Sequence, residues 1–397
     1  MLAATLAVNS AVLQLVAAVA SLTFVLVTGI EGLLGLGPAI VLAASGLIAL
    51  PAGRLMDRVG RKPVIAAGFV LGAIGCGLAA IATSTGSIVA VIFGFALIGA
   101  ANGTALLIRT AAGDLYPPER RARGISFVLF GAVFGAILGP AVFAPMFAGK
   151  HVEADALTVP WLVAGGISLA ALGVILNVRP DPKRVAELLR TSDGEPEPAA
   201  PLREIVRRPG VIPAMASALA SFGVMVSVMN LTGYVVVDHH HHDQADVFPI
   251  IGAHVLGMFA LVLVVGALID RIGQTPALAA GLLVMAASCA GLLWVSGVVG
   301  TAILLFGLGL GWNVSFVAAT ARLADRTGPA ERGKMLGFND QLSALLGAAL
   351  ALTGGVALDV LGVGALALGS AAIAVLPVLW AVSERRRNKG LPQVAPP

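Results

Sequence analysis

Four side chains able to bind a soft metal ion lie in two neighbouring apolar stretches of the chain. Met225 and Met229 are four residues apart in one stretch, and His254 and Met258 are four residues apart in the next. On a helix, residues four apart share a face, so each pair would present two donor atoms in one direction. Thioether and imidazole donors favour Cu(I) over hard cations. The spacing therefore makes these four residues candidate copper ligands on two adjacent helices, with packing in an apolar helix as the alternative for the methionines.

A short loop rich in histidine joins the two stretches. Its four consecutive histidines are His239, His240, His241 and His242, and the acidic residues around them are Asp238, Asp243 and Asp246. Histidine-rich tracts are typical metal binders, and the neighbouring carboxylates would attract cations. We expect this loop to capture metal ions ahead of the two ligand pairs. A solvated turn with no binding role is the alternative.

The composition indicates an all-α membrane protein. Of the 397 residues, 58% are hydrophobic and only 12% are charged, and soluble domains have about 25% charged residues. Apolar runs of about 20 residues, the length that crosses a bilayer as a helix, recur along the whole chain. The twelve predicted spans lie near residues 5–28, 34–54, 64–83, 87–111, 123–147, 159–178, 211–236, 249–269, 276–296, 299–321, 335–356 and 361–382.

The distribution of basic residues predicts how these spans are oriented. Arginine and lysine gather in the segments on one side of the membrane, whereas the loops on the other side contain only Lys150. By the positive-inside rule, both termini lie in the cytoplasm of a multi-pass protein of the inner, or plasma, membrane. The isoelectric point of about 9.4 is then explained by basic residues on the cytoplasmic side of the membrane. This argues against a nucleic-acid partner and leaves the lipid bilayer as the expected partner.

The two halves of the chain repeat each other. Residues 53–63 (GRLMDRVGRKP) correspond to residues 266–276 (GALIDRIGQTP), and Cys76 and Cys289 fall at the same offset. A six-plus-six repeat is typical of secondary transporters with a site between the halves. The predicted units are a six-helix bundle at 1–180, a cytoplasmic linker with amphipathic segments at 181–208, a second bundle at 209–384 and a cytoplasmic tail at 385–397.

The segment at 53–63 resembles the loop between spans 2 and 3 of the major facilitator superfamily, and this resemblance covers the whole chain. It implies the twelve-helix fold of that family, transport by alternating access, and a cytoplasmic latch that includes Asp57, Arg58 and Arg61. A carboxylate such as that of Asp57 is favoured at a helix N-terminus. The alternative is that these charges only anchor the loop at the membrane surface.

The Met-x-x-x-Met and His-x-x-x-Met motifs resemble those of the CcoA-type copper importers within that superfamily. In that family the four residues bind copper, and the imported metal supplies haem–copper oxidase assembly. The resemblance implies this role for Met225, Met229, His254 and Met258. Copper would then be the transported substrate, with no resident cofactor, a cytoplasmic copper acceptor would be a partner, and the protein is expected to be a monomer.

The two motifs lie on antiparallel neighbouring spans, and this arrangement predicts their relative height. If Met225 is level with Met258, then Met229 is level with His254. The two levels would be about 6 Å apart at the rise of an α-helix. We expect a two-step series of donors that leads inward from the histidine loop.

Other polar residues inside the predicted spans are candidates for lining the cavity between the halves. Asn102, Asn230 and Asn313 are the ones expected there, with hydrogen bonding between helices as an equal alternative. Asp114 and Asp340 could carry protons, and an ion pair of Arg109 with Asp114 is the structural alternative. The driving force of transport stays open.

These patterns predict an importer that carries copper, as Cu(I), across the inner membrane. One rival is an importer or proton-coupled exporter of an organic substrate such as riboflavin or a drug. The other is a receptor that binds copper without moving it. The sequence contains no nucleophile–base set, phosphate loop or hydrolytic metal motif, so we do not expect an enzyme.

Overall fold

A computed structural model describes the chain except residues 116–120, 149–152, 190–199, 328 and 390–397. The first half contains α1 (Leu2–Thr28), η1 (Glu31–Leu33), α2 (Leu36–Val59), α3 (Arg61–Thr85), α4 (Ile88–Leu106), α5 (Ile108–Gly113), α6 (Arg121–Phe147), η3 (Ala154–Leu157) and α7 (Thr158–Leu176). The linker contains α8 (Pro182–Leu189) and α9 (Leu202–Arg207). The second half contains α10 (Val211–Tyr234), the π-helical turn η4 (Val235–His239), α11 (Gln244–Phe259), α12 (Val262–Ile272), α13 (Gln274–Gly291), α14 (Val298–Asp325), α15 (Pro329–Leu361) and α16 (Val363–Lys389).

The all-helical prediction is confirmed over the described residues, which contain no strand. A helix satisfies its own backbone hydrogen bonds, which a segment surrounded by lipid must do. Eleven helices in the described part are long and apolar enough to cross a membrane. The shorter apolar helix α11, continued by α12, supplies the twelfth span.

Two of the predicted spans are broken in the structure. The span predicted at 249–269 ends its first helix at Phe259 and resumes at Val262, and the span predicted at 87–111 breaks at Leu107. Neither break contains a proline or glycine, the usual sequence signals of a kink. In the first case α11 packs on α6 and α14, and after the break α12 still contacts both of these helices and also contacts α13.

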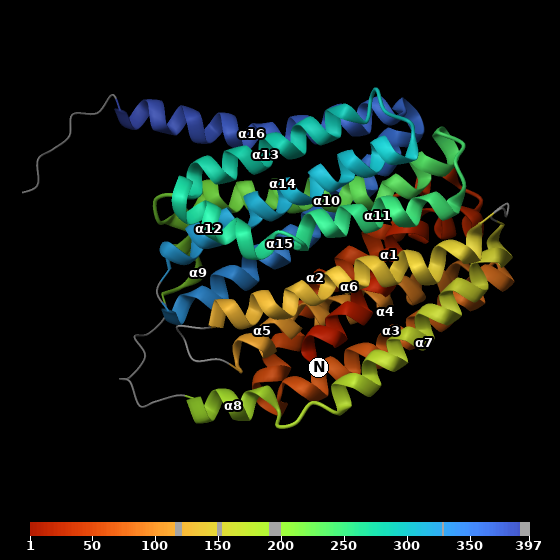
Figure 1. Ribbon diagram of the computed structural model, residues 1–397, viewed down its shortest axis with the longest axis horizontal. Helices are drawn as coiled ribbons and strands as arrows, with labels where there is room; N and C mark the ends of the chain where they lie inside the picture. The colour runs from red at the N-terminus through yellow and green to blue at the C-terminus, as the bar shows by residue number, and fades with distance from the viewer. Residues whose placement is uncertain (116–120, 149–152, 190–199, 328, 390–397) are drawn as a thin grey trace, which may run out of the picture.

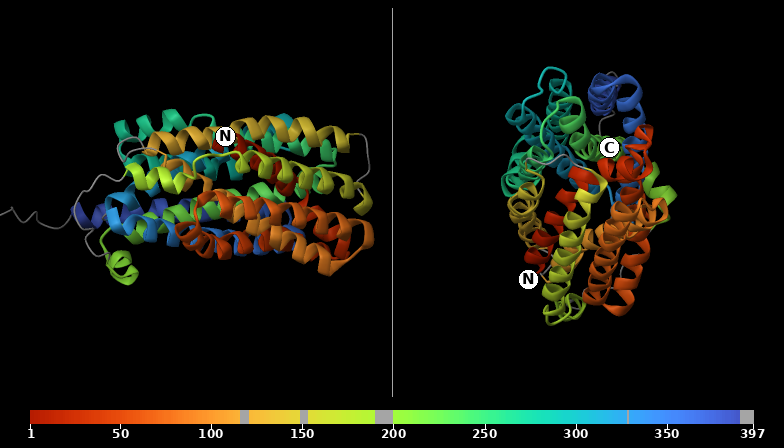
Figure 2. Two further views of the ribbon diagram at one scale, coloured as in Figure 1. Left: turned by 90° about the horizontal axis from the view of Figure 1, so that it is seen from below. Right: turned by 90° about the vertical axis from the view of Figure 1, so that its right-hand side faces the viewer.

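The helices run roughly lengthwise through the molecule, and the two halves lie side by side (Figure 1; Figure 2, right). They meet where α2 packs on α15, α6 on α11 and α1 on α10. We call the end that carries residues 239–242 the histidine end. The opposite end, where Arg61 and the linker helices lie, is the arginine end.

At the histidine end, α1 and α10 approach each other closely. A Cβ added to Gly233 would lie 2.3 Å from the carbonyl oxygen of Ala18, so only a glycine allows this spacing. The hydroxyl of Ser21 donates a hydrogen bond to the carbonyl of Asn230 over 3.2 Å. These contacts join the two halves.

Further contacts close the same end. A Cβ on Gly35, before α2, would lie 2.1 Å from the carbonyl oxygen of Ala351 in α15. The ring of Phe248 in α11 stacks with Phe143 and Phe147 of α6 at centroid distances of 5.9 and 5.3 Å. The conformation is therefore one in which the halves are packed together at the histidine end.

Candidate functional site

His254 is fully buried in α11 and is held by the neighbouring helix α14. Its Nδ1 atom lies 2.8 Å from the carbonyl oxygen of Leu305. A carbonyl only accepts hydrogen bonds, so Nδ1 carries the hydrogen and the Nε2 atom of the neutral ring presents its lone pair. Nε2 is buried and has no hydrogen-bond partner. Histidines that bind metals are commonly oriented in this way, with the second ring nitrogen donating to a backbone carbonyl.

Met258 lies one turn from His254 and faces the same helix. A Cβ on Gly309 of α14 would lie 3.2 Å from Cγ of Met258 and 2.3 Å from the carbonyl oxygen of His254. The missing side chain of Gly309 lets the backbones of α11 and α14 come together. Both donors of the second predicted pair therefore lie against α14.

Met225, on α10, also lies on the side that faces α14. One turn earlier, the hydroxyl of Ser221 is 2.6 Å from the hydroxyl of Ser315 in α14, and residues four apart share a helix face. Met225 is buried, with 2% of its surface exposed. Met229 and Met258 are partly buried against the same hydrophobic cluster.

α14 provides a common reference for the height of the two pairs. Ser221 is level with Ser315, and α10 and α14 are antiparallel, so Met225 comes near the level of Gly311 and Met229 near that of Gly307. Along the same helix, His254 contacts Leu305 and Met258 contacts Gly309. This register gives the order expected from the sequence, with Met229 and His254 nearer the histidine end.

The described residues contain no group of three or more His, Cys, Asp or Glu side chains placed to hold a metal ion. Cys76 and Cys289 are both free and buried. A site with three or more protein donors in the described part of this chain would therefore need methionine as well as histidine donors.

The histidine loop begins with the last residue of η4, His239, after the end of α10. The amides of His240 and His242 donate to the carbonyls of Val235 and Val236 over 3.0 and 3.1 Å, which continues the wide π-type turn. Burial lowers the pKa of His240 below its ordinary value, and the neighbouring histidines lower it further. His240 therefore keeps a neutral ring, with a free lone pair, at neutral pH.

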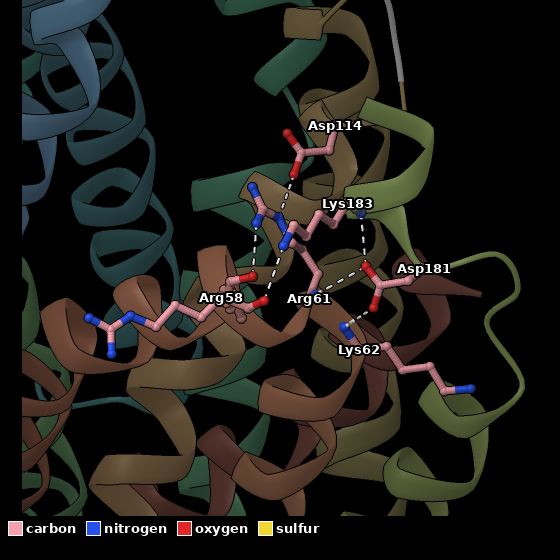
Figure 3. A network of polar contacts seen from close by, with 7 residues as sticks. Arg58, Arg61, Lys62, Asp114, Asp181 and Lys183 are labelled. Atoms are coloured by element: carbon pink, nitrogen blue, oxygen red, sulfur yellow. Dashed lines mark hydrogen bonds and ion pairs between the residues drawn. The ribbon is translucent and has the colours of Figure 1, made fainter. Parts of the chain in front are cut away.

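Of the predicted latch, Arg61 is the residue whose contacts are best described. Its Nε atom forms an ion pair with Asp114 at 2.7 Å, and its Nη1 atom donates to the carbonyl of Met56 over 3.0 Å (Figure 3). These partners lie in the first half. Arg58 accepts a hydrogen bond at its carbonyl from Nζ of Lys183, and the side chain of Asp57 lies outside the described part.

Asp181, which the sequence interpretation missed, occupies the N-terminus of α3. Its carboxylate accepts hydrogen bonds from the backbone amides of Arg61 over 3.1 Å and Lys62 over 2.9 Å (Figure 3). A carboxylate at this position satisfies free amides and interacts favourably with the helix dipole. Asp181 therefore connects the linker to the start of α3, beside the predicted latch residues. In the sequence, the only sign of this contact was the Asp-Pro pair at the start of α8.

Arg109 of α5 forms an ion pair with Asp340 of α15, which joins the two halves. The alternative pairing of Arg109 with Asp114 is wrong, because Asp114 is bound by Arg61. The break after α4 separates Arg109 from the preceding helix. The sequence left the partner of Arg109 open, because spacing along the chain does not show contacts with the other half.

The three asparagines expected in the cavity differ in their contacts. Asn230 donates to the carbonyl of Val226 in its own helix over 2.7 Å. Asn102 donates to the hydroxyl of Ser45 in α2 over 3.4 Å, and its Oδ1 atom has no partner. The buried Nδ2 atom of Asn313 also has no partner. Asn102 and Asn313 therefore keep unused hydrogen-bonding capacity.

An aromatic cluster that the sequence interpretation missed lies next to the candidate ligands. The ring of Trp312 stacks on Phe316 at 5.0 Å and meets Phe259 at 6.1 Å, and Phe316 is 6.3 Å from Phe222. These rings come from α10, α11 and α14. The indole nitrogen of Trp312 is buried without a hydrogen-bond partner. In the sequence, the four-residue spacing of Trp312 and Phe316 was the signal that could have indicated this cluster.

Comparison with known families decides the kind of protein. A model described as Major Facilitator Superfamily matches residues 2–352. The chain is a member of the major facilitator superfamily. It is therefore a multi-pass secondary transporter, as the internal repeat predicted.

Individual relatives agree with this assignment. The chain is 32% identical over 337 residues to an uncharacterized MFS-type transporter, YdeG, of Bacillus subtilis, covering 81% of this chain and 76% of the relative. It is 32% identical over 310 residues to the riboflavin transporter RfnT of Brucella anthropi, covering 73% and 71%. An inward-open structure of the xylose transporter XylE from E. coli shares the fold, with a TM-score of 0.75 at 15% identity, over 96% of this chain and 94% of that one.

Proposed function

We propose that this superfamily member imports copper, as Cu(I), through Met225, Met229, His254 and Met258. The observation that carries the proposal is the orientation of His254, whose Nδ1 atom is engaged by Leu305 while the buried Nε2 atom has no partner. A buried nitrogen that lacks a partner costs free energy unless a ligand uses it. A soft cation is the ligand that imidazole and thioether donors favour.

The histidine end would face the outside, since the positive-inside rule places the arginine-rich segments in the cytoplasm. In the conformation described, α1 and α10 are in close contact at the histidine end, at Ala18 and Gly233. Copper would enter when these contacts separate, and would leave toward the arginine end. Weak donors suit this exchange, because a site must release its ion as well as bind it.

The decisive experiment is uptake of copper by cells or membrane vesicles that contain the protein. We expect His254→Ala and Met229→Ala to lose most of the uptake, because each removes a donor. Met215→Leu is the matched control, since Met215 is a buried methionine of α10 outside the ligand set. Undiminished uptake in both ligand variants would contradict the assignment, and binding of copper without any uptake would favour a receptor.

A second candidate substrate is a planar organic molecule such as riboflavin, and the aromatic cluster favours it. Phe259, Trp312 and Phe316 offer ring faces for stacking, and the free indole N–H of Trp312 could donate to a carbonyl group. The similarity to a riboflavin transporter adds to this candidate. Riboflavin uptake that is lost in Trp312→Phe and retained in His254→Ala would select it over copper.

A further inference from the structure

Two of the four loop histidines lie ring to ring at the histidine end. The rings of His240 and His242 have centroids 6.4 Å apart and are nearly perpendicular. Between them, His241 has a left-handed backbone with φ of 55°. A non-glycine residue in this conformation is strained, and such strain gathers at functional positions. The turn at His241 brings its two neighbours together.

His242 is anchored by a contact from another loop. Its Nε2 atom lies 2.8 Å from the carbonyl oxygen of Ser296, which precedes α14. Because the carbonyl only accepts, Nε2 carries the hydrogen, and Nδ1 is the nitrogen that can offer a lone pair to a metal ion. This is the same arrangement as at His254, with the two ring nitrogens exchanged.

His240 has a matching free nitrogen. Its Nδ1 atom is buried and has no hydrogen-bond partner in the structure. His239, in contrast, packs its ring on that of Tyr234 at 5.9 Å, and His241 is exposed. The loop therefore divides into one pair of imidazoles that lie together and two that do not.

The geometry points to a two-histidine metal site formed by His240 and His242, which takes one imidazole-preferring ion such as Cu(I). Imidazole nitrogen binds such ions at about 2.0 Å, so two rings on opposite sides of one ion have centroids roughly 6 Å apart. The separation of 6.4 Å is close to this value, and a small rotation of either ring aims a lone pair at the ion. The flanking Asp238 and Asp243 add negative charge.

The identity of the ion rests on the proposed function, but binding at this pair does not depend on transport. The site would hold an incoming ion at the histidine end before the inner donors receive it. Of the four loop histidines expected to capture metal ions, only His240 and His242 would then bind the ion. His239 and His241 would then position the loop without binding the ion.

Titration of the purified full-length protein with Cu(I) tests this site. The inner donors are first removed together, as Met225→Leu, Met229→Leu, His254→Asn and Met258→Leu, so that only loop binding remains. We expect one ion per protein in this background, and its loss when His240→Ala and His242→Ala are added. The matched control adds His239→Ala and His241→Ala to the same background and should retain the ion.

A separate variant guards against a change in loop structure. His242→Gln places an amide N–H where it can still donate to Ser296, but removes the second ring nitrogen. We expect it to lose the ion as His242→Ala does. The inference would be overturned if the His239/His241 control lost binding equally, or if His242→Gln retained the ion. It would also be overturned if the background protein bound no ion, or bound Mg²⁺ equally well. Absence of copper uptake by the wild-type protein, with loop binding intact, would instead overturn only the proposed transport.

Discussion

The Nδ1 atom of His254 lies 2.8 Å from the carbonyl oxygen of Leu305, so α14 determines how the histidine of α11 is oriented. The next turn of α14 presents Gly309, against which both His254 and Met258 pack. Both donors of the second motif thus depend on one neighbouring helix. The consequences can be tested on α14 itself, away from the proposed ligands.

Gly309→Ala should impair the protein although it leaves all four proposed ligands in place. The new Cβ would lie 2.3 Å from the carbonyl oxygen of His254, which forces α11 and α14 apart. We expect a loss of about 1–3 kcal/mol in stability, measured by thermal unfolding in detergent, together with reduced copper uptake. Gly173→Ala, where a Cβ meets no atom within 4 Å, is the control and should change neither quantity.

The ion pair between Arg109 and Asp340 should couple the two halves. Removal of either partner leaves an unpaired charge inside a helical region, which is costlier than removal of both. In a double-mutant cycle with Arg109→Leu and Asp340→Leu, we expect a coupling of roughly 0.5–2 kcal/mol in the stability. The lower part of that range is expected, because the side chains are 34% and 30% exposed and solvent weakens such pairs. If the effects of the two single substitutions on stability were strictly additive, the ion pair would not couple the two halves.

Closure at the histidine end should depend on Gly233. In Gly233→Ala the new Cβ would meet the carbonyl oxygen of Ala18 at 2.3 Å, so the packed conformation becomes less favourable. A cysteine introduced as Ser21→Cys, in a background with Cys76→Ala and Cys289→Ala, reports on this closure. We expect a water-soluble maleimide to label it faster when Gly233→Ala is present. Gly166→Ala, which faces open space, should leave the labelling rate unchanged.

Asp181 should stabilise the start of α3 from the linker. Asp181→Ala removes the acceptor of two backbone amides, those of Arg61 and Lys62. Loss of such a cap costs about 1 kcal/mol, which thermal unfolding can detect. Asp181→Asn keeps an oxygen acceptor and should lose less. The exposed Glu153→Ala is the control for loss of a surface carboxylate, and an effect as large as that of Asp181→Ala would argue against a specific cap.

The local chemistry of each span could be predicted from the sequence, but the contacts between spans could not. Asn230 was a candidate for lining the cavity or for hydrogen bonding between helices, and its side chain donates to Val226 in its own helix. Arg109 was considered as a partner of Asp114, and the structure pairs it with Asp340 in the other half. Both outcomes depend on how the helices rotate and pack against each other, which a pattern along one helix does not contain.

By itself, the sequence determined that the chain is helical and spans a membrane, because long apolar runs leave the backbone no other way to satisfy its hydrogen bonds. It also determined the duplication and the helical face shared by each donor pair, since both follow from spacing. Only the tertiary structure decided that α11 ends at Phe259, that His254 is oriented by Leu305, and that His240 lies beside His242. These features arise where segments distant in sequence meet, and the physical reason is that packing between helices sets the direction of each side chain.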